Sequence, residues 1–259
     1  MSGASVHPGS FVDPRAQLGE GVVVEPGAVI GPHVRIGAGT RVGSHALVTG
    51  WTTIGMNCHL HHGAVLGSAP QDLKYSGEPS HLEVGDRTVV REYATLNLAT
   101  EPGATTRVGS DCLLMAYSHV AHNCHLGDRV IVANAVQFAG YVTVQDWAIV
   151  GGGTVVHQFV RIGCHAMIGG GSRIAQDVAP YIKLAGSPPR LAGVNSVGLE
   201  RRGFDAESRT AIDRAYKLLF RGARTTTAAV AEMRSQYPGI AAVELLARFA
   251  ETSERGLTR

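Results

Sequence analysis

The stretch VEPGAVIGPHVRIGAGTRVG, residues 24–43, carries an aliphatic residue at every sixth position, at Val24, Ile30, Ile36 and Val42. The same spacing runs from Val6 to Leu66, resumes between Val84 and Leu96, and continues without a gap from Val108 to Ile174. A second column, four residues after each aliphatic position, holds small or β-branched side chains. A period of six matches neither an amphipathic helix nor the simple alternation of a strand.

A six-residue unit fits a short strand followed by a corner, and glycine or proline often stands where the corner is expected. Three such units close a triangular coil of eighteen residues. Stacked coils form a parallel β-helix in which neighbouring coils hydrogen-bond at roughly 4.8 Å. The repeat therefore predicts a mainly β protein, with a β-helical prism over residues 1–190. Segments 67–83 and 97–107 break the repeat, and we expect them to project from the prism as loops.

The composition changes after the repeat, and residues 191–259 are expected to form a C-terminal helical domain. A helix is predicted over 205–222, a second is capped by Thr226 or Thr227 and ends before Pro238, and a third covers 241–253. Between Arg201 and Arg224 the chain has seven Lys or Arg and three Asp or Glu residues. This basic segment is either a solvated helix face or a docking surface for an acidic partner.

The bulk composition excludes several classes of protein. The formal net charge is only +2, which argues against a nucleic-acid partner held by bulk charge. No apolar run is long enough to predict a membrane span, and the first residues lack the pattern of a signal peptide, so we expect a cytosolic protein. The four cysteines show no C-x2-C spacing and are expected to be free thiols.

The stretch SHVAHNCHLG, residues 118–127, resembles a chelate because His119, His122 and His125 are spaced by three. His119 and His125 occupy the same phase of consecutive repeats, so they lie on different sides of the triangle and cannot share a metal within one chain. We therefore predict no metal site in the chain. A zinc site between chains, as in a metal-dependent hydratase, remains an alternative of a different class.

The eighteen-residue coil also predicts which residues stack on His122. Gly140 lies one coil further and Gln158, preceded by His157, one coil beyond that. A histidine with a near-neutral pKa and a bare glycine, whose N–H a substrate carbonyl can approach, suit acyl transfer. The alternative is a set of surface histidines on a non-catalytic scaffold.

Two glycine triplets, 151–153 and 169–171, are also eighteen residues apart and stack. They form either tight corners or a groove for an acyl chain, whose far end Gly170 would leave open.

The repeat [LIV]-G-x-x-[STAVC]-x resembles that of the hexapeptide-repeat acyltransferases, and this resemblance implies a left-handed prism. Within that group the chain is similar to the UDP-N-acetylglucosamine acyltransferases, which catalyse the first step of lipid A synthesis. The motifs that carry the likeness are QDLKYSGEP at 71–79, HVAHNCHLG at 119–127, VHQFVRIG at 156–163, GGGSRIAQDVAPY at 169–181 and GVN with RRGF between 193 and 204.

The resemblance implies roles for individual residues. His122 would be the general base that activates the 3-position of the sugar, and the Gly140 amide would be the oxyanion donor. The positions implied to bind substrate are Asp72, Lys74, His119, Tyr141, His157 and Gln158 for sugar and acyl group, Asn195, Arg201 and Arg202 for the diphosphate, and Gly170 for acyl length.

The resemblance also implies partners. The donor would be an (R)-3-hydroxyacyl-acyl carrier protein and the acceptor a UDP-amino sugar. The enzyme would be a homotrimer with sites between neighbouring prisms, and it would need no cofactor.

Three places depart from the family pattern: Asn123 replaces a frequent aspartate, Tyr141 a frequent histidine, and Asn97-Leu98 a usual His-Arg pair. We expect acylation of a 3-hydroxyl, with a 3-amino sugar or another hexapeptide-repeat acyltransferase reaction as alternatives.

Overall fold

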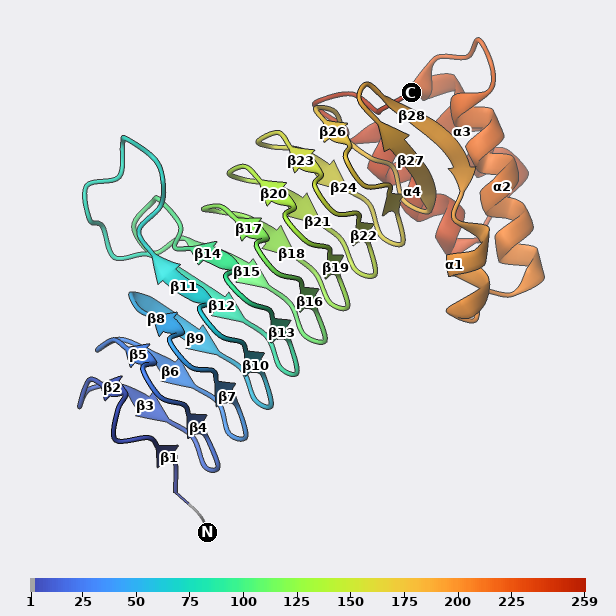
Figure 1. Ribbon diagram of the computed structural model, residues 1–259. Coiled ribbons are helices and arrows are strands. Elements are labelled where there is room, and N and C mark those ends of the chain that lie inside the picture. The colour runs from blue at the N-terminus through green and yellow to red at the C-terminus, as the bar shows by residue number, and fades with distance from the viewer. Residues whose placement is uncertain (1–2) are drawn as a thin grey trace.

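The computed structural model describes residues 3–259, in which three sheets form the faces of a triangular prism and helices stand at its C-terminal end (Figure 1). Sheet A comprises β1 (Ser5–Val6), β4 (Val23–Val24), β7 (Arg41–Val42), β10 (His59–Leu60), β13 (Val89–Val90), β16 (Leu113–Leu114), β19 (Ile131–Val132), β22 (Ile149–Val150), β25 (Met167–Ile168), β27 (Ile182–Gly186) and β28 (Pro189–Val194). Sheet B comprises β2 (Phe11–Val12), β5 (Val29–Ile30), β8 (Leu47–Val48), β11 (Val65–Ser68), β14 (Thr95–Asn97), β17 (His119–Val120), β20 (Gln137–Phe138), β23 (Val155–Val156) and β26 (Arg173–Ile174). Sheet C comprises β3 (Gln17–Leu18), β6 (Arg35–Ile36), β9 (Trp51–Ile54), β12 (His81–Val84), β15 (Thr105–Val108), β18 (His125–Leu126), β21 (Thr143–Val144) and β24 (Arg161–Ile162).

The chain visits the sheets in the order A, B, C, and we name each corner by the two sheets that it joins. Each strand pairs in parallel with the strand one coil later, as in the pairing of His119 with Gln137. That step is the predicted eighteen residues. The two coils that carry loops are longer, since Trp51 pairs with His81 and His81 with Thr105.

The core is the inside of the prism. From Val22 onward both predicted columns lie inside it, because residues two apart on a strand point to the same side of the sheet, whereas Val6 at the open N-terminal end is exposed. Ile30 and Leu114 of the aliphatic column are fully buried, as are Val22, Cys124 and Val142 of the second column.

The two breaks in the repeat are loops, but they are shorter than predicted. They span residues 69–80, between β11 and β12, and 98–104, between β14 and β15, and they project together from one edge of the prism (Figure 1). Residues 81–83 and 105–107 belong to strands instead. Leu82 and Thr106 occupy the second column of the repeat, and both are fully buried in the prism. The loops contact each other, since Ser80 Oγ donates to the carbonyl of Ala99 at 2.5 Å.

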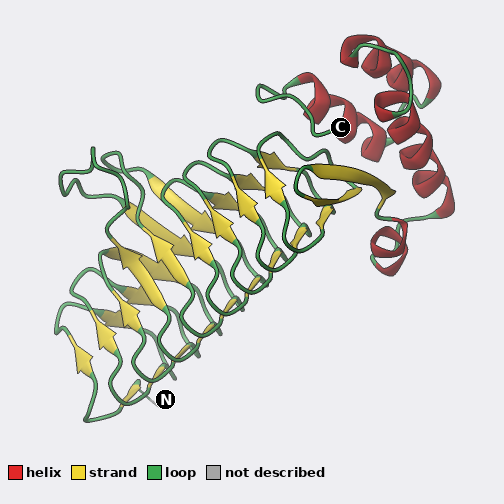
Figure 2. Ribbon diagram, turned by 45° about the horizontal axis from the view of Figure 1, so that its top comes forward, coloured by secondary structure: helices red, strands yellow, loops and turns green. Residues whose placement is uncertain are grey.

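The C-terminal part begins with the antiparallel hairpin of β27 and β28, so the predicted domain boundary at residue 190 falls inside β28. Four helices follow, which Figure 2 shows clustered at one end of the prism: α1 (Ser196–Arg201), α2 (Ala206–Phe220), α3 (Thr226–Gln236) and α4 (Ala241–Glu251). The last three were predicted, and α1 was not. The N-cap of α3 is Thr225 rather than the predicted Thr226 or Thr227, because its side chain accepts the Ala228 N–H. Among residues 3–259, no helix combines the length and apolar composition that a bilayer crossing requires.

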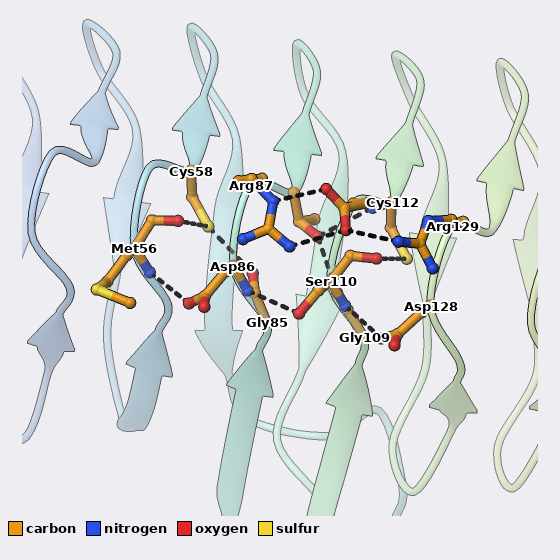
Figure 3. A network of polar contacts seen from close by, with 12 residues as sticks. Met56, Cys58, Gly85, Asp86, Arg87, Gly109, Ser110, Cys112, Asp128 and Arg129 are labelled. Carbon is orange, nitrogen blue, oxygen red and sulfur yellow. Dashed lines mark hydrogen bonds and ion pairs between the residues drawn. The ribbon is translucent and has the colours of Figure 1, made fainter.

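The C–A corner shows how this fold satisfies the backbone amides of its turns (Figure 3). The Met56 N–H donates to Asp86, the Asp86 N–H to Ser110, the Ser110 N–H to Asp128 and the Asp128 N–H to Asp146, all at 2.7–3.1 Å. In each case the side chain belongs to the next coil. At this corner the first amide therefore points toward the side chain that stands one coil further along.

Candidate active site

A cavity of about 710 Å³ opens at the B–C corner, between that corner and the two projecting loops. Its lining residues are Asp72, Lys74, Glu78, Thr100, Glu101, Pro102, His122, Tyr141, Gln158 and Phe159. Five of the residues singled out in the sequence line this cavity, namely Asp72, Lys74, His122, Tyr141 and Gln158. The others from the predicted set lie elsewhere or beneath its surface.

His122 and Gly140 are in direct contact, as the eighteen-residue coil predicts. A methyl group on Gly140 would fall 2.6 Å from His122 Nε2, so the imidazole occupies the space that a side chain would need. The sequence led us to expect that this space admits a substrate carbonyl. The structure assigns it to the His122 ring, and glycine is required at 140 for that reason.

The Gly140 N–H stands at the first position of its corner, like the four capped amides of the C–A corner. Within residues 3–259 it donates no hydrogen bond to the backbone or to a side chain. The equivalent amides of the C–A corner donate to a side chain one coil further along, and the residue at that position of the B–C corner is Gln158, which lines the cavity. This amide is therefore a free donor next to the imidazole, which is the arrangement that an oxyanion requires.

The protonated nitrogen of the neutral His122 ring is set by its neighbour Asn123. Asn123 Oδ1 accepts the backbone N–H of Thr100 at 3.1 Å, which identifies this atom as the carboxamide oxygen. The same oxygen lies 3.0 Å from His122 Nδ1, and it can only accept. His122 Nδ1 therefore carries the hydrogen, and Nε2, the nitrogen next to Gly140, has a free lone pair.

Tyr141 closes one side of the cavity. Its ring stacks on Phe159, with centroids 4.9 Å apart, and meets the edge of the His122 ring at 5.4 Å. The Tyr141 hydroxyl donates to the Glu101 carboxylate, and this bond raises the pKa of Tyr141 and is the main cause that lowers the pKa of Glu101. Tyr141 is therefore neutral and Glu101 ionised at neutral pH.

His119 and His157 flank the cavity without lining it. His119 lies in β17 on the outer side of sheet B, and its Nδ1 is 2.7 Å from Thr95 Oγ1. Burial is the main cause that lowers the pKa of His119, with a smaller contribution from His122. His157 is exposed at the end of β23, where its Nδ1 donates to the carbonyl of Gln158 at 3.1 Å.

The glycine triplets lie at a different corner, A–B, where Gly170 stacks above Gly152. A methyl group on Gly170 would fall 3.0 Å from the Gly152 carbonyl oxygen and would otherwise meet open space. Gly170 is thus separated from His122 by the width of sheet B.

The predicted diphosphate residues lie near the third corner, C–A. Asn195 is buried, caps α1 by accepting the Gly198 N–H, and donates to the carbonyl of His165 at 3.0 Å. Arg202 lies over the Trp147 ring at 5.0 Å and donates to His165 Nδ1 at 3.0 Å. Arg201 is exposed. One chain therefore does not bring these residues to His122.

Of the departures from the family pattern, only Tyr141 and Asn123 reach the site. Asn97 is buried and donates to the carbonyl of Ala69 at 2.8 Å, which holds the start of the first loop. Leu98 is buried in the core, against Gly50. These two residues shape the loops and do not face the cavity.

Residues 3–259 contain no cluster of three or more His, Cys, Asp or Glu side chains arranged to hold a metal ion. The four cysteines are buried free thiols, as predicted. Burial raises the pKa of the Cys124 thiol to about 12, which removes it from nucleophilic chemistry.

The sequence reasoning missed Thr100, Glu101, Glu78 and Phe159. Phe159 follows Gln158 and stacks one coil after Tyr141, so the eighteen-residue step alone was enough to find it. Thr100 and Glu101 lie in a loop that the repeat does not describe, and only the fold brings them to Asn123.

The comparisons with known proteins cover the whole chain. Family models match it at residues 177–258, as "Udp N-acetylglucosamine O-acyltransferase; Domain 2", and at 3–38 and 105–140, as the bacterial transferase hexapeptide. The acyl-[acyl-carrier-protein]–UDP-N-acetylglucosamine O-acyltransferase of Herminiimonas arsenicoxydans is 45% identical over 259 residues, which cover 98% of this chain and 99% of that protein.

Solved structures of similar proteins belong to the same family. LpxA from Acinetobacter baumannii is 39% identical with a TM-score of 0.95, covering 98% of this chain and 99% of that one. The UDP-N-acetylglucosamine acyltransferase of Bacteroides fragilis is 36% identical, with a TM-score of 0.95 and coverage of 98% and 100%. The β-helix predicted from the repeat and the left hand implied by the resemblance are thereby confirmed. The chain is an acyltransferase and belongs to the acyl-[acyl-carrier-protein]–UDP-N-acetylglucosamine O-acyltransferase family.

Proposed function

We propose that this protein transfers an (R)-3-hydroxyacyl group from acyl carrier protein to the 3-hydroxyl of UDP-N-acetylglucosamine, the first step of lipid A synthesis. His122 acts as the general base and the Gly140 N–H as the oxyanion donor. The observation that carries this proposal is the contact of His122 with Gly140, at a cavity where Nε2 is unprotonated and the Gly140 amide is free.

The reaction needs one base and one fixed donor. His122 Nε2 takes the proton of the sugar hydroxyl as its oxygen attacks the thioester carbonyl, and the Gly140 N–H binds the negative charge that develops on the carbonyl oxygen. The C–S bond then breaks, and the leaving thiolate takes the proton back from the imidazolium. The products are the 3-O-acyl sugar and the free carrier thiol, so no covalent enzyme intermediate is required.

The other lining residues suit the binding of a sugar nucleotide. Lys74 and Gln158 supply donors, and Asp72 supplies an acceptor whose Oδ1 also receives the Lys74 backbone N–H at 2.9 Å. His119 and His157 would flank the acyl group, and Gly170 would leave room for the end of the acyl chain. Arg201 and Arg202 would hold the diphosphate, because a guanidinium forms paired hydrogen bonds with phosphate. Asn195 would position them by capping α1.

These groups lie at three different corners of one chain, and a homotrimer would bring them together. In a trimer of prisms the corners of neighbouring copies meet, so a C–A or A–B corner of one chain can complete the B–C corner of the next. The outer side of sheet A supports such packing, because it presents the partly exposed apolar side chains of Leu113, Ile131, Ile149 and Met167.

The acyl carrier protein would dock on the basic segment of the helical domain. Three of its seven cations are already paired within the chain: Arg209 with Glu200, Lys217 with Asp213, and Arg224 with Glu232. Arg201, Arg214 and Arg221 are exposed, and they are the cations that an acidic partner would meet.

The acceptor is proposed to be the 3-hydroxyl rather than a 3-amine. Of the departures that raised the alternative, Asn97 and Leu98 do not face the cavity, and Tyr141 is neutral. Mass spectrometry of the products formed from UDP-N-acetylglucosamine and from its 3-amino analogue tests the choice directly. A strong preference for the amine would replace this acceptor assignment without changing the roles of His122 and Gly140.

The test of the base is His122→Ala, which should lower kcat by about 10²- to 10⁴-fold in a folded protein. His125→Ala is a matched control, because His125 is exposed on sheet C, where its Nε2 lies 3.1 Å from the carbonyl of Thr105 and away from the cavity. Near-normal turnover of His122→Ala, with the same thermal stability as the control, would show that another group is the base.

A further inference from the structure

We propose that Glu101 is a positioning residue for His122: its carboxylate holds the Asn123 carboxamide so that the carboxamide oxygen receives the His122 Nδ1–H. The inference rests on the proposed role of His122 as the base. It adds a loop residue that no motif marks, and it explains how a chain with asparagine at position 123 orients its imidazole.

The contacts form one continuous chain. Asn123 Nδ2 donates to Glu101 Oε2 at 2.7 Å, and Asn123 Oδ1 faces His122 Nδ1 at 3.0 Å. A carboxamide that rotated by half a turn would aim its NH2 group at Nδ1 and its oxygen at a carboxylate. The contacts of the oxygen with the Glu101 carboxylate and of the NH2 group with the Thr100 N–H would both be repulsive, and an NH2 group at Nδ1 would require the other tautomer. Glu101, together with Thr100, therefore selects one orientation of Asn123 and thereby one tautomer of His122.

Glu101 is itself held firmly, although it lies on a loop. The sequence Glu101-Pro102-Gly103-Ala104 forms a turn closed by the Ala104 N–H on the Glu101 carbonyl at 3.0 Å. Proline at the second position and glycine at the third, with φ of 73° at Gly103, are the residues that a type II turn requires. The Tyr141 hydroxyl binds the other carboxylate oxygen, Oε1, so both oxygens of Glu101 have partners.

Asn123 is suited to receive this contact. It stands at the second position of its corner with φ of 59°, a left-handed conformation that asparagine and aspartate tolerate better than most residues. An aspartate there would bring its charge directly to Nδ1. In this chain the negative charge stands one hydrogen bond further away, on Glu101, and it still favours the imidazolium that forms when His122 takes the proton.

The experiment compares Glu101→Ala and Glu101→Gln in the full-length protein. Glu101→Ala should lower kcat roughly 10- to 100-fold, the effect of losing one hydrogen bond to a charged group, with KM for the UDP-sugar changed by less than about twofold. Glu101→Gln can accept from Asn123 and contact Tyr141, so it should restore most of the lost turnover. Glu83→Gln is the matched control, because Glu83 also binds a side chain of the prism, Arg107 at 2.7 Å, but lies outside the network.

The substitution Glu101→Ala is also tested in an Asn123→Asp variant. Asn123→Asp gives Nδ1 its own carboxylate, so adding Glu101→Ala to it should be neutral or favourable, since two facing carboxylates repel each other. The two substitutions should therefore be strongly non-additive. Additive losses would overturn the inference.

A measurement of the His122 tautomer tests this inference separately from the assignment of His122 as the base. Long-range 1H–15N spectra of histidine-labelled protein at alkaline pH should show His122 as the Nδ1–H tautomer, with His122→Gln identifying its signals. Glu101→Ala should shift the ring toward the Nε2–H form, and an unchanged tautomer would overturn the inference whatever happens to kcat. A shifted tautomer with unchanged kcat would support the positioning role and refute His122 as the base.

Discussion

Gly140→Ala should inactivate the enzyme by moving the base rather than by unfolding the prism. The φ angle of Gly140 lies outside the left-handed region, so alanine fits the backbone there without strain. The added methyl group, however, would fall 2.6 Å from His122 Nε2. The perturbation is therefore confined to the imidazole.

The size of the effect follows from this contact. Carbon and nitrogen atoms that do not hydrogen-bond are ordinarily separated by about 3.5–4.0 Å, so the ring must retreat by about 1 Å. A displacement of that size in a reacting group costs on the order of 10²-fold in rate. His122 is only partly buried and can rotate outward, so the free energy of unfolding should change by less than about 1 kcal/mol.

The assay is steady-state kinetics with an acyl-acyl carrier protein and UDP-N-acetylglucosamine, together with thermal melts of the same preparations. The double variant His122→Ala, Gly140→Ala is the control, because the methyl group has no imidazole to displace there, and it should be about as active as His122→Ala alone. Wild-type turnover of Gly140→Ala would refute the reasoning, since the ring contact would then be irrelevant to catalysis.

Three further outcomes are expected. Ile36→Ala removes a buried side chain of the aliphatic column and should lower the free energy of unfolding by about 2–5 kcal/mol in urea titrations; a loss below about 1 kcal/mol would contradict the packed prism. Burial, with the Arg202 guanidinium nearby, lowers the pKa of His165 to about 4, so between pH 6.5 and that value the unfolded chain binds more protons than the folded one. Stability should therefore fall by up to about 3 kcal/mol as the pH drops through this window, and His165→Gln should lose less over the same range in urea titrations. Gly170→Met should shorten the preferred acyl chain in a series of acyl carrier substrates, and an unchanged preference would remove the acyl groove from the A–B corner.

The six-residue period was enough to predict the prism, because few backbone conformations repeat every six residues. The repeat places an aliphatic residue at every sixth position and a small residue two positions before each of them. All of these side chains can point inward only if each six-residue unit turns one corner. The same arithmetic predicted the contact of His122 with Gly140, since both residues lie in uninterrupted eighteen-residue coils. It failed at Leu82 and Thr106, because the insertions hide the phase of the second column.

What the sequence determined by itself is therefore the part of the protein where neighbours in space are separated by a constant number of residues: the core, the corners and the base with its glycine. The tertiary structure alone decided which loop residues reach that base. Glu101 meets Asn123 because two irregular loops pack against each other and a proline–glycine turn aims one carboxylate at the B–C corner. The periodicity of the sequence does not predict the contact of Glu101 with Asn123, since the path of a loop depends on every contact it makes.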